Sequence, residues 1–275
     1  MSFYAKSSFE SFDFLKEQLQ KHKKLYFTRF GDGEVISMMG QNHRNYKSSP
    51  ELTKELQESF LTDHPQYLIA LSVNMPFEKG MSRGLFAPYK KNNEFEDFIN
   101  DQLMAKKKVY ESQIMFHYLS VFKPYMMYDF FEEYIRPKRK MFVGCTPIEI
   151  VEKLYGKTDF YVNVPPKHAY NSMDEWWPEI VSNINDVELL IPSAGAATNV
   201  INKRLWEMDQ EIHSMDIGSI IDAVDLTISR TWIRLKGHKI QKLLPHKHRE
   251  KRFSKRIIFV LKDIKYFFRK FINRK

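Results

Sequence analysis

Apolar and polar positions along the chain follow two alternating patterns. Short runs that are almost continuously apolar, and rich in β-branched or aromatic residues, are typical of strands buried on both faces of a sheet. Six runs, most of them of this kind, predict strands at residues 25–30, 67–73, 140–145, 159–164, 187–192 and 211–217. Between them, apolar residues recur at helical spacing. This spacing is clearest at Phe9, Phe12, Leu15 and Leu19, and at Leu52, Leu56 and Phe60 after the helix start Ser49–Pro50.

The regular alternation of strands and helices predicts an α/β fold with a largely parallel sheet flanked by helices. Residues 75–138 are less regular, and we expect helices with long loops there. The one sharp change of composition follows Pro245. We therefore divide the chain into a folded body, residues 1–245, and a tail, residues 246–275.

The positive charge of the protein is concentrated in the tail. Its 275 residues carry a net charge of +9, but residues 246–275 alone hold twelve Lys and Arg against two acidic residues. The body, with 31 basic and 32 acidic residues, is close to neutral, whereas non-specific nucleic-acid binding favours a basic face on the body. We therefore expect no specific nucleic-acid partner.

The tail has the pattern of a basic amphipathic helix. Its apolar residues recur at steps of three and four: Phe253, Ile257, Val260, Leu261, Ile264, Phe267, Phe268 and Phe271. Such a helix suits the interface of an anionic membrane, which it would lie on without crossing. The alternative is a C-terminal helix docked on the body.

Cysteine usage and the N-terminus indicate a compartment. A single cysteine excludes a disulfide framework, and the first ten residues lack the apolar run of a signal peptide. We expect a cytoplasmic protein that is peripheral at the inner face of the cell membrane.

The first candidate for chemistry is the turn Arg29-Phe30-Gly31-Asp32-Gly33-Glu34, directly after a predicted strand. In parallel sheets, ligands bind beyond the carboxyl ends of the strands. Asp32 and Glu34 offer hard oxygen ligands that suit Mg²⁺ or Mn²⁺, and Arg29 could hold a phosphate. Gly31 and Gly33 permit a sharp turn with positive φ. The alternative is a surface turn in which Asp32 caps the next helix and Glu34 stabilises its first turn.

The second candidate is a loop of small residues between a predicted strand and a helix that ends near Met208. It contains Ser193, Gly195, Ala196 and Thr198. Small residues let a diphosphate approach the amides at a helix N-terminus, although close packing of helix on sheet selects them equally.

Two further loops follow predicted strands. Asp216 could bind a ribose hydroxyl or a metal, but capping of the following helix is the better single-residue interpretation. The proline-stiffened loop Val164–Asn171 offers Lys167, His168 and Tyr170 to a nucleotide or sugar. Cys145 also follows a strand, but we interpret a lone cysteine beside apolar sequence as packing.

Together these motifs resemble the GT-D-type glycosyltransferases, bacterial enzymes first catalogued as a domain of unknown function and marked by an Asp-x-Glu motif. The resemblance rests on FTRFGDGE, on a VPxxxAY segment, and on the small-residue loop followed by MDIG, and it covers about residues 20–225. Members of the family often carry a Ser/Thr-Arg-Pro-Tyr stretch near mid-chain, where this chain has Glu111-Ser112-Gln113-Ile114-Met115.

The resemblance implies a Rossmann-like catalytic domain that uses a divalent metal and a UDP-sugar. Asp32 and Glu34 would then hold Mn²⁺ or Mg²⁺, with Arg29 as the arginine before the motif. The nucleotide-sugar would contact Arg29, Gly31, Gly33, Ser193, Gly195, Ala196, Thr198 and Asp216. The acceptor would be a glycan or a lipid-linked molecule in the assembly of cell-surface polysaccharide or glycoconjugates.

Two other functions remain open at this point. Paired carboxylates are also typical of metal-dependent nucleases and phosphotransferases, but here they lie apart from the basic charge. A non-enzymatic protein could instead use the tail to bind nucleic acid. For the glycosyltransferase, His168, Asp174 and Glu175 are candidates by location for the general base.

Overall fold

The structure is a computed structural model that describes residues 3–43, 47–81, 85–86, 92–227, 229–249 and Leu261. Most of the predicted tail, and with it the amphipathic helix, lies outside the described residues. In the part that is described, the chain forms a short 3₁₀ turn at His246–His248 (η7). No helix within the described ranges is both long and apolar enough to span a membrane.

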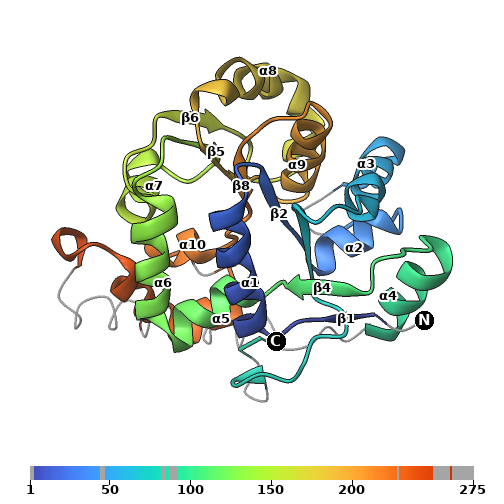
Figure 1. The fold of residues 1–275 in the computed structure, drawn as a ribbon, viewed down its shortest axis with the longest axis horizontal. Coiled ribbons are helices and arrows are strands. Elements are labelled where there is room, and N and C mark those ends of the chain that lie inside the picture. Colours follow the sequence, from blue (N-terminus) through green and yellow to red (C-terminus); the bar gives the residue numbers. More distant parts are fainter. Residues whose placement is uncertain are drawn as a thin grey trace, which may run out of the picture.

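The centre of the fold is a sheet in which every paired strand runs parallel to its neighbour (Figure 1). Over the described residues its order is β1 (Tyr4–Ala5), β4 (Val109–Ser112), β3 (Tyr67–Leu71), β2 (Leu25–Phe30), β8 (His213–Met215), β7 (Leu189–Ser193), β5 (Lys140–Gly144) and β6 (Phe160–Asn163). All six predicted strands are confirmed, and β2 has the predicted bounds.

Strand β4 corrects the sequence analysis, which expected only helices and loops between residues 75 and 138. Its sequence, VYES, is short and carries a carboxylate in the middle. Glu111 is buried, and the Nζ of Lys6 lies 2.8 Å from its Oε1. A charged residue inside so short a strand removes the continuous apolar pattern by which buried strands are recognised.

Helices cover both faces of the sheet, so the body has three layers (Figure 1). Alternate strand residues point to opposite faces: Phe27 packs into one core and Tyr26 into the other. The first core is covered by α1 (Ser8–Lys21), α5 (Met115–Phe122), α6 (Pro124–Phe130), α7 (Ile148–Tyr155), α10 (Ile220–Val224), α11 (Thr231–Lys236) and the 3₁₀ helix η6 (Gly237–Leu243). The second is covered by α2 (Asp32–Met38), α3 (Pro50–Leu61), α4 (Asn92–Asp97), α8 (Met173–Asn183) and α9 (Ala197–Glu207).

Local sequence explains where the predicted helices begin. At the start of α1, the Ser7 hydroxyl accepts from the Glu10 amide while the Glu10 carboxylate accepts from the Ser7 amide. At α3, the Ser49 hydroxyl accepts from the amide of Leu52 at 3.2 Å, and Pro50 occupies the first turn.

The order of the strands creates a switch point at the middle of the sheet. From β2 the chain moves outward to β3 and β4, then crosses to β5 and β6 on the other side, and returns through β7 and β8 to lie beside β2. Loops leaving neighbouring strands near such a reversal diverge, which opens a crevice beyond the carboxyl ends of the strands.

Candidate active site

A cleft of about 300 Å³ lies beyond the carboxyl ends of the central strands. It is lined by the loops that follow β2, β8, β7, β5 and β6 and by Gln113 after β4. The four loops singled out in the sequence therefore meet in one place. The predicted residues in its lining are Arg29, Gly31, Asp32, Gly33, Glu34, Ser193, Gly195, Thr198 and Asp216. Ala196 is buried in the second core and is not among the lining residues.

An ion pair joins two of these loops at the base of the cleft. The Nε of Arg29 lies 3.2 Å from Oδ1 of Asp216, and both side chains are largely buried. Burial raises the pKa of Asp216, Arg29 lowers it and Glu34 raises it again, with a net rise. The carboxylates of Asp216 and Glu34 are thus close enough for each to disfavour ionisation of the other.

Asp216 does not cap the next helix, so that interpretation was wrong. Helix α10 begins at Ile220 with Ser219 at its N-cap. The backbone at Gly218 instead hydrogen-bonds the Asp216 carboxylate. Asp216 is therefore fixed by Arg29 and by its own turn.

The Arg29 guanidinium is held on three sides. Its Nη1 donates to the carbonyl of Gln113 at 3.1 Å and lies 3.4 Å from Nε2 of His117. Because a guanidinium has no acceptor, Nε2 of His117 accepts, and the ring is neutral. Burial lowers the pKa of His117 strongly, and the positive charge of Arg29 lowers it further. The His117 ring stacks on Trp232 with centroids 5.2 Å apart.

Gly218 provides the space in which the guanidinium lies. A Cβ on this residue would fall 2.1 Å from Nη2 of Arg29, and its φ of +72° is in the left-handed region. Glycine is therefore required here on two grounds. Gly218 is the last residue of the MDIG segment, 215–218, which also contains Asp216.

The turn after β2 places both carboxylates of the Asp-x-Glu motif at the first turn of α2. Asp32 is exposed at the first helical position, and Glu34 is half-buried. Oε2 of Glu34 accepts from the Gly31 amide at 2.9 Å, so Glu34, and not Asp32, satisfies the helix terminus. Gly31 has an extended backbone at φ −91°, without the positive φ that glycine permits. A Cβ there would lie 3.1 Å from Nε2 of Gln113.

The small-residue loop leads from β7 into α9 and is tied to its neighbours. The Ala194 amide donates to Oγ1 of Thr198 at 3.0 Å, and Gly195 has a φ of +61°. Nδ2 of Asn199 donates to Oγ1 of Thr28 and to the carbonyl of Arg29, at 3.1 and 3.0 Å. The N-terminus of α9 is thereby fixed against β2, beside the carboxylates.

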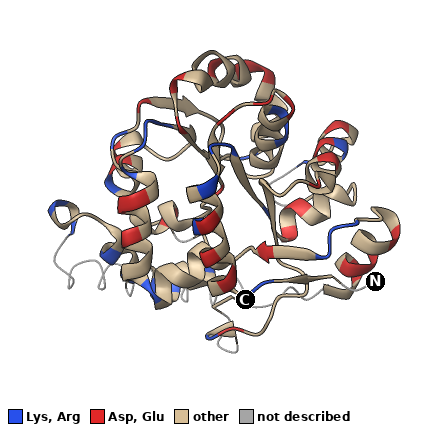
Figure 2. Ribbon diagram, in the orientation of Figure 1, with Lys and Arg blue, Asp and Glu red and all other residues tan. Residues whose placement is uncertain are grey.

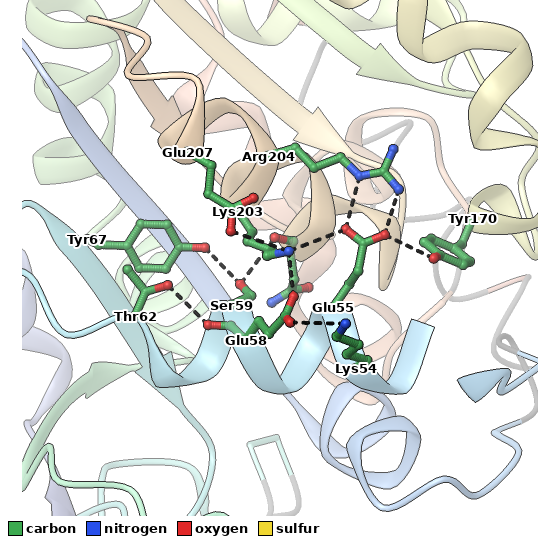
Figure 3. A network of polar contacts seen from close by, with 11 residues as sticks. Lys54, Glu55, Glu58, Ser59, Thr62, Tyr67, Tyr170, Lys203, Arg204 and Glu207 are labelled. Carbon is green, nitrogen blue, oxygen red and sulfur yellow. Dashed lines mark hydrogen bonds and ion pairs between the residues drawn. The ribbon is translucent and has the colours of Figure 1, made fainter. Parts of the chain in front are cut away.

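Helix α9 is also fixed from its outer side by a network of ion pairs with α3 (Figure 3). Arg204 donates twice to the carboxylate of Glu55, at 3.0 and 2.6 Å, and Tyr170 donates to it at 3.0 Å. Lys203 lies 2.6 Å from Glu58 and 3.4 Å from Glu207. We call these residues, with Lys54, the α3–α9 network.

The proline-stiffened loop contributes less than the sequence suggested. Pro165, Pro166, Lys167, His168 and Ala169 line the cleft, whereas Tyr170, Asn171, Asp174 and Glu175 do not. Nδ1 of His168 accepts from the Lys47 amide at 3.0 Å. Of the three bases suggested by location, only His168 therefore reaches the cleft.

Sequence reasoning missed three cleft residues that follow Asp216. Asp222 on α10 is half-buried, and the Ser229 hydroxyl donates to its carboxylate. Burial raises the pKa of Asp222, which Ser229 and Arg230 lower only in part. Ser229 and Arg230 also line the cleft. Asp222 lies one helical turn beyond the MDIG segment, a spacing that could have drawn attention to it.

Cys145 lines the cleft as well, although the sequence interpretation was inert packing. The thiol is exposed, and burial of part of the side chain raises its pKa, with a further rise from Asp222. A raised pKa disfavours the thiolate, so this cysteine is not activated as a nucleophile.

The family model described as "Glycosyltransferase GT-D fold" matches residues 27–252. The chain belongs to the GT-D glycosyltransferase family. The GT-D match spans β2 to the last described turn and so includes every loop of the cleft. It favours glycosyl transfer over the nuclease and nucleic-acid-binding alternatives.

Solved structures share the GT-D fold. One described as "A New Glycosyltransferase (DUF1792) from Streptococcus sanguinis" superimposes with a TM-score of 0.62 at 16% identity, over 82% of this chain and 84% of that one. Another, described as "The highly conserved domain of unknown function 1792 has a distinct glycosyltransferase fold", gives 0.59 at 18% identity, over 82% and 81%. No curated protein matches the chain significantly.

The carboxylates of this GT-D protein fit a metal only in a particular way. Within the described ranges, no three His, Cys, Asp or Glu side chains are grouped as a metal cage. Mg²⁺ and related ions commonly take one or two carboxylates and complete their shell with water and substrate phosphates. Asp32, exposed to the cleft, and Glu34 beside it match that mode of binding.

Proposed function

We propose that this GT-D glycosyltransferase transfers a sugar from a UDP-sugar to a hydroxyl of a glycan or lipid-linked acceptor, in the assembly of cell-surface polysaccharide or glycoconjugates. The observation that carries the proposal is the meeting of two features in one cleft. The carboxylates at 32 and 34 share the cleft with the N-terminus of α9, where a diphosphate would meet helix-end amides and the positive charge of a metal held by the two carboxylates.

The reaction requires stabilisation of the leaving group. As the bond between the sugar and the diphosphate breaks, negative charge grows on the phosphate oxygens. Asp32 and Glu34 would hold Mn²⁺ or Mg²⁺, which when bound supplies a Lewis acid for this charge. The backbone around Gly195, where no Cβ intervenes, would bring N–H groups toward the same oxygens.

Arg29 has a different role from direct phosphate binding. Its Nε and Nη1 are directed to Asp216, Gln113 and His117. We assign it the positioning of Asp216, whose carboxylate would contact the nucleotide's ribose or the metal.

We assign the acceptor's base to Asp222. Its carboxylate lines the cleft, its hydrogen bond with Ser229 fixes its position, and its raised pKa makes it a better proton acceptor. The acceptor hydroxyl would lose its proton to Asp222 as its oxygen attacks the anomeric carbon, and the diphosphate would leave with the bonding electrons.

The tail would attach the enzyme to the inner face of the cell membrane. Its net charge of +10 and its apolar spacing support binding to anionic lipid. Full-length protein is expected to sediment with anionic vesicles, less so at high salt. A chain ending at Pro245 should sediment less while keeping UDP affinity, and equal sedimentation would contradict this role.

Calorimetric titration with UDP, with and without Mn²⁺, tests the central proposal. We expect UDP affinity that depends on the metal in the wild type and loses this dependence in Asp32→Ala. The matched control is Asp101→Ala, an exposed carboxylate outside the cleft. UDP affinity that is the same with and without metal would overturn the metal assignment, and absence of UDP binding would overturn the donor.

A further inference from the structure

A cluster of lysines lies on the face of the body formed by α5, α6 and η6. It consists of Lys79, Lys236, Lys239 and Lys242, which come from two distant parts of the chain. Nζ of Lys239 donates to the carbonyl of Val121 at 2.9 Å. In Figure 2 basic positions gather on the C-terminal segments beside α6. None of the four lines the cleft.

Three of these lysines lie over aromatic rings. Nζ of Lys79 and Nζ of Lys239 lie 5.5 and 5.7 Å from the ring centroid of Phe122. Nζ of Lys242 lies 5.1 Å from the ring of Tyr125. Each contact is within the range of a cation–π interaction. The charges are thus held in place by side chains that do not neutralise them.

The cluster lacks the carboxylates that surround Lys203 in the α3–α9 network. Among the described residues, no Asp or Glu oxygen lies within 4.0 Å of any of the four Nζ atoms. Partial burial lowers the pKa of Lys239, and the charges of Lys236, Lys242 and Lys79 lower it further. The like charges therefore repel one another, and a polyanion that binds here relieves this repulsion.

Exposed apolar side chains adjoin the cluster. Phe77 and Tyr125 are 74% and 56% exposed, and Leu235 is 38% exposed. Phe77 lies two residues before Lys79, Tyr125 lies under Lys242, and Leu235 precedes Lys236. Aromatic and aliphatic groups next to lysines are typical of protein surfaces that rest in the interfacial region of a bilayer.

We propose that this face of the folded body, the lysine cluster with Phe77, Tyr125 and Leu235, binds the anionic headgroups of a phospholipid bilayer. The inference goes beyond the membrane attachment proposed for the tail, because it gives the catalytic body its own contact with the lipid. The face also continues in sequence into the tail, since Lys242 is followed within four residues by the start of the basic segment. The exposed Leu235 favours lipid over nucleic acid, because bases stack on aromatic rings and gain little from aliphatic contacts.

Co-sedimentation of the full-length protein with vesicles tests this face. The variant replaces the four cluster lysines with Gln. The matched control replaces Lys23, Lys54, Lys106 and Lys157, four exposed lysines that lie outside the cluster and the cleft, and so removes the same charge. The vesicles are phosphatidylcholine with phosphatidylserine, and phosphatidylcholine alone.

We expect the cluster variant to bind phosphatidylserine vesicles about 10²-fold more weakly than the control variant, since each lysine near an anionic surface contributes severalfold. Tyr125→Ser should weaken binding even at high salt, where the charges are screened. Unchanged UDP affinity of all variants shows that they are folded, and keeps this test separate from that of the donor site. Equal vesicle binding by the two lysine variants would overturn the proposal. It would also be overturned if the cluster variant bound RNA or heparin more weakly than the control variant but bound vesicles equally well.

Discussion

Two groups of charged residues in this protein lie close together, and the pKa values of their carboxylates are shifted in opposite directions. In the α3–α9 network, Glu55 has Arg204, Tyr170 and Lys203 around it. Although burial alone would raise the pKa of Glu55, these partners lower it. In the cleft, burial raises the pKa of Asp216 and of Asp222, and the nearby cations reverse this only in part.

The direction of the pKa shift separates carboxylates that stabilise the fold from carboxylates that are available to bind a ligand. A carboxylate whose pKa is lowered gains stability from ionisation, whereas one whose pKa is raised loses stability by it. We therefore expect changes in the cleft to affect catalysis, and changes in the network to affect stability.

The largest expected effect is on catalysis, from a substitution in the cleft. Asp222→Asn should lower the rate of sugar transfer about 10²- to 10⁴-fold, the range for loss of a general base. Stability should not fall, because the buried charge is removed while Ser229 keeps a partner. Steady-state kinetics and thermal melting measure the two effects. Asp225→Asn, three residues on, is the control, and equal rates for the two variants would exclude Asp222 as the base.

The same residue predicts a pH dependence. The raised pKa of Asp222 places the acid limb of the kcat/KM profile above the ordinary range of an aspartate. Because the folded pKa lies above the unfolded one, its ionisation costs stability as the pH rises through that window. A profile for wild type that rises only in the ordinary range of a free carboxyl would contradict the assignment.

Replacing the metal ligands should give the next largest effect. Asp32→Ala should reduce transfer about 10²-fold or more, through loss of oriented charge at the leaving group, without loss of stability. Glu34→Ala should reduce both the rate of transfer and the stability, because it also removes the hydrogen-bond acceptor of the Gly31 amide. Glu34→Gln keeps that acceptor but not the charge, so it should retain stability and lose activity. Wild-type rates in both alanine variants would show that the motif binds no catalytic metal.

Gly218→Ala sharpens the comparison, since it disturbs the surroundings of Arg29 without removing a charge. We expect a loss of about 1–3 kcal/mol in the free energy of unfolding, because the new Cβ overlaps Arg29. Gly40→Ala is the control: its φ of +73° is nearly the same, but nothing lies within 4 Å of the new Cβ. Denaturant unfolding of both variants isolates the overlap, and equal losses would refute it.

The smallest expected effect lies in the network. Glu55→Gln should lower stability by about 1 kcal/mol, the upper end for ion pairs near the surface, and leave kcat unchanged. Since the folded pKa of Glu55 is lowered, its contribution is present above the ordinary pKa and is lost as the pH falls through the folded pKa. The melting curves of wild type and variant should therefore converge in acid. A large loss of kcat would show that the network is part of the catalytic site.

The sequence predicted the features that depend on local pattern. Six strands were recognisable because most of their runs are short and predominantly apolar, and the meeting of four loops followed from the parallel sheet. The pairing of Arg29 with Asp216 was not predictable, because nothing local tells which loops come into contact. The lysine cluster was not predictable for a related reason. The net charge of the body is close to zero because it sums over all of its surfaces. Only the fold brings Lys79 beside Lys239.

The place of β8 in the sheet has a consequence for the synthesis of the protein. Leu25 in β2 pairs with His213 in β8, so the middle of the sheet cannot close until most of the chain has left the ribosome. Until then the edge of β2 stays open to other strands, a state that favours aggregation. Contacts so distant in sequence also slow folding. The central sheet should therefore close only after β8 has been synthesised, and chaperones that shield strand edges are expected to raise the yield of active enzyme.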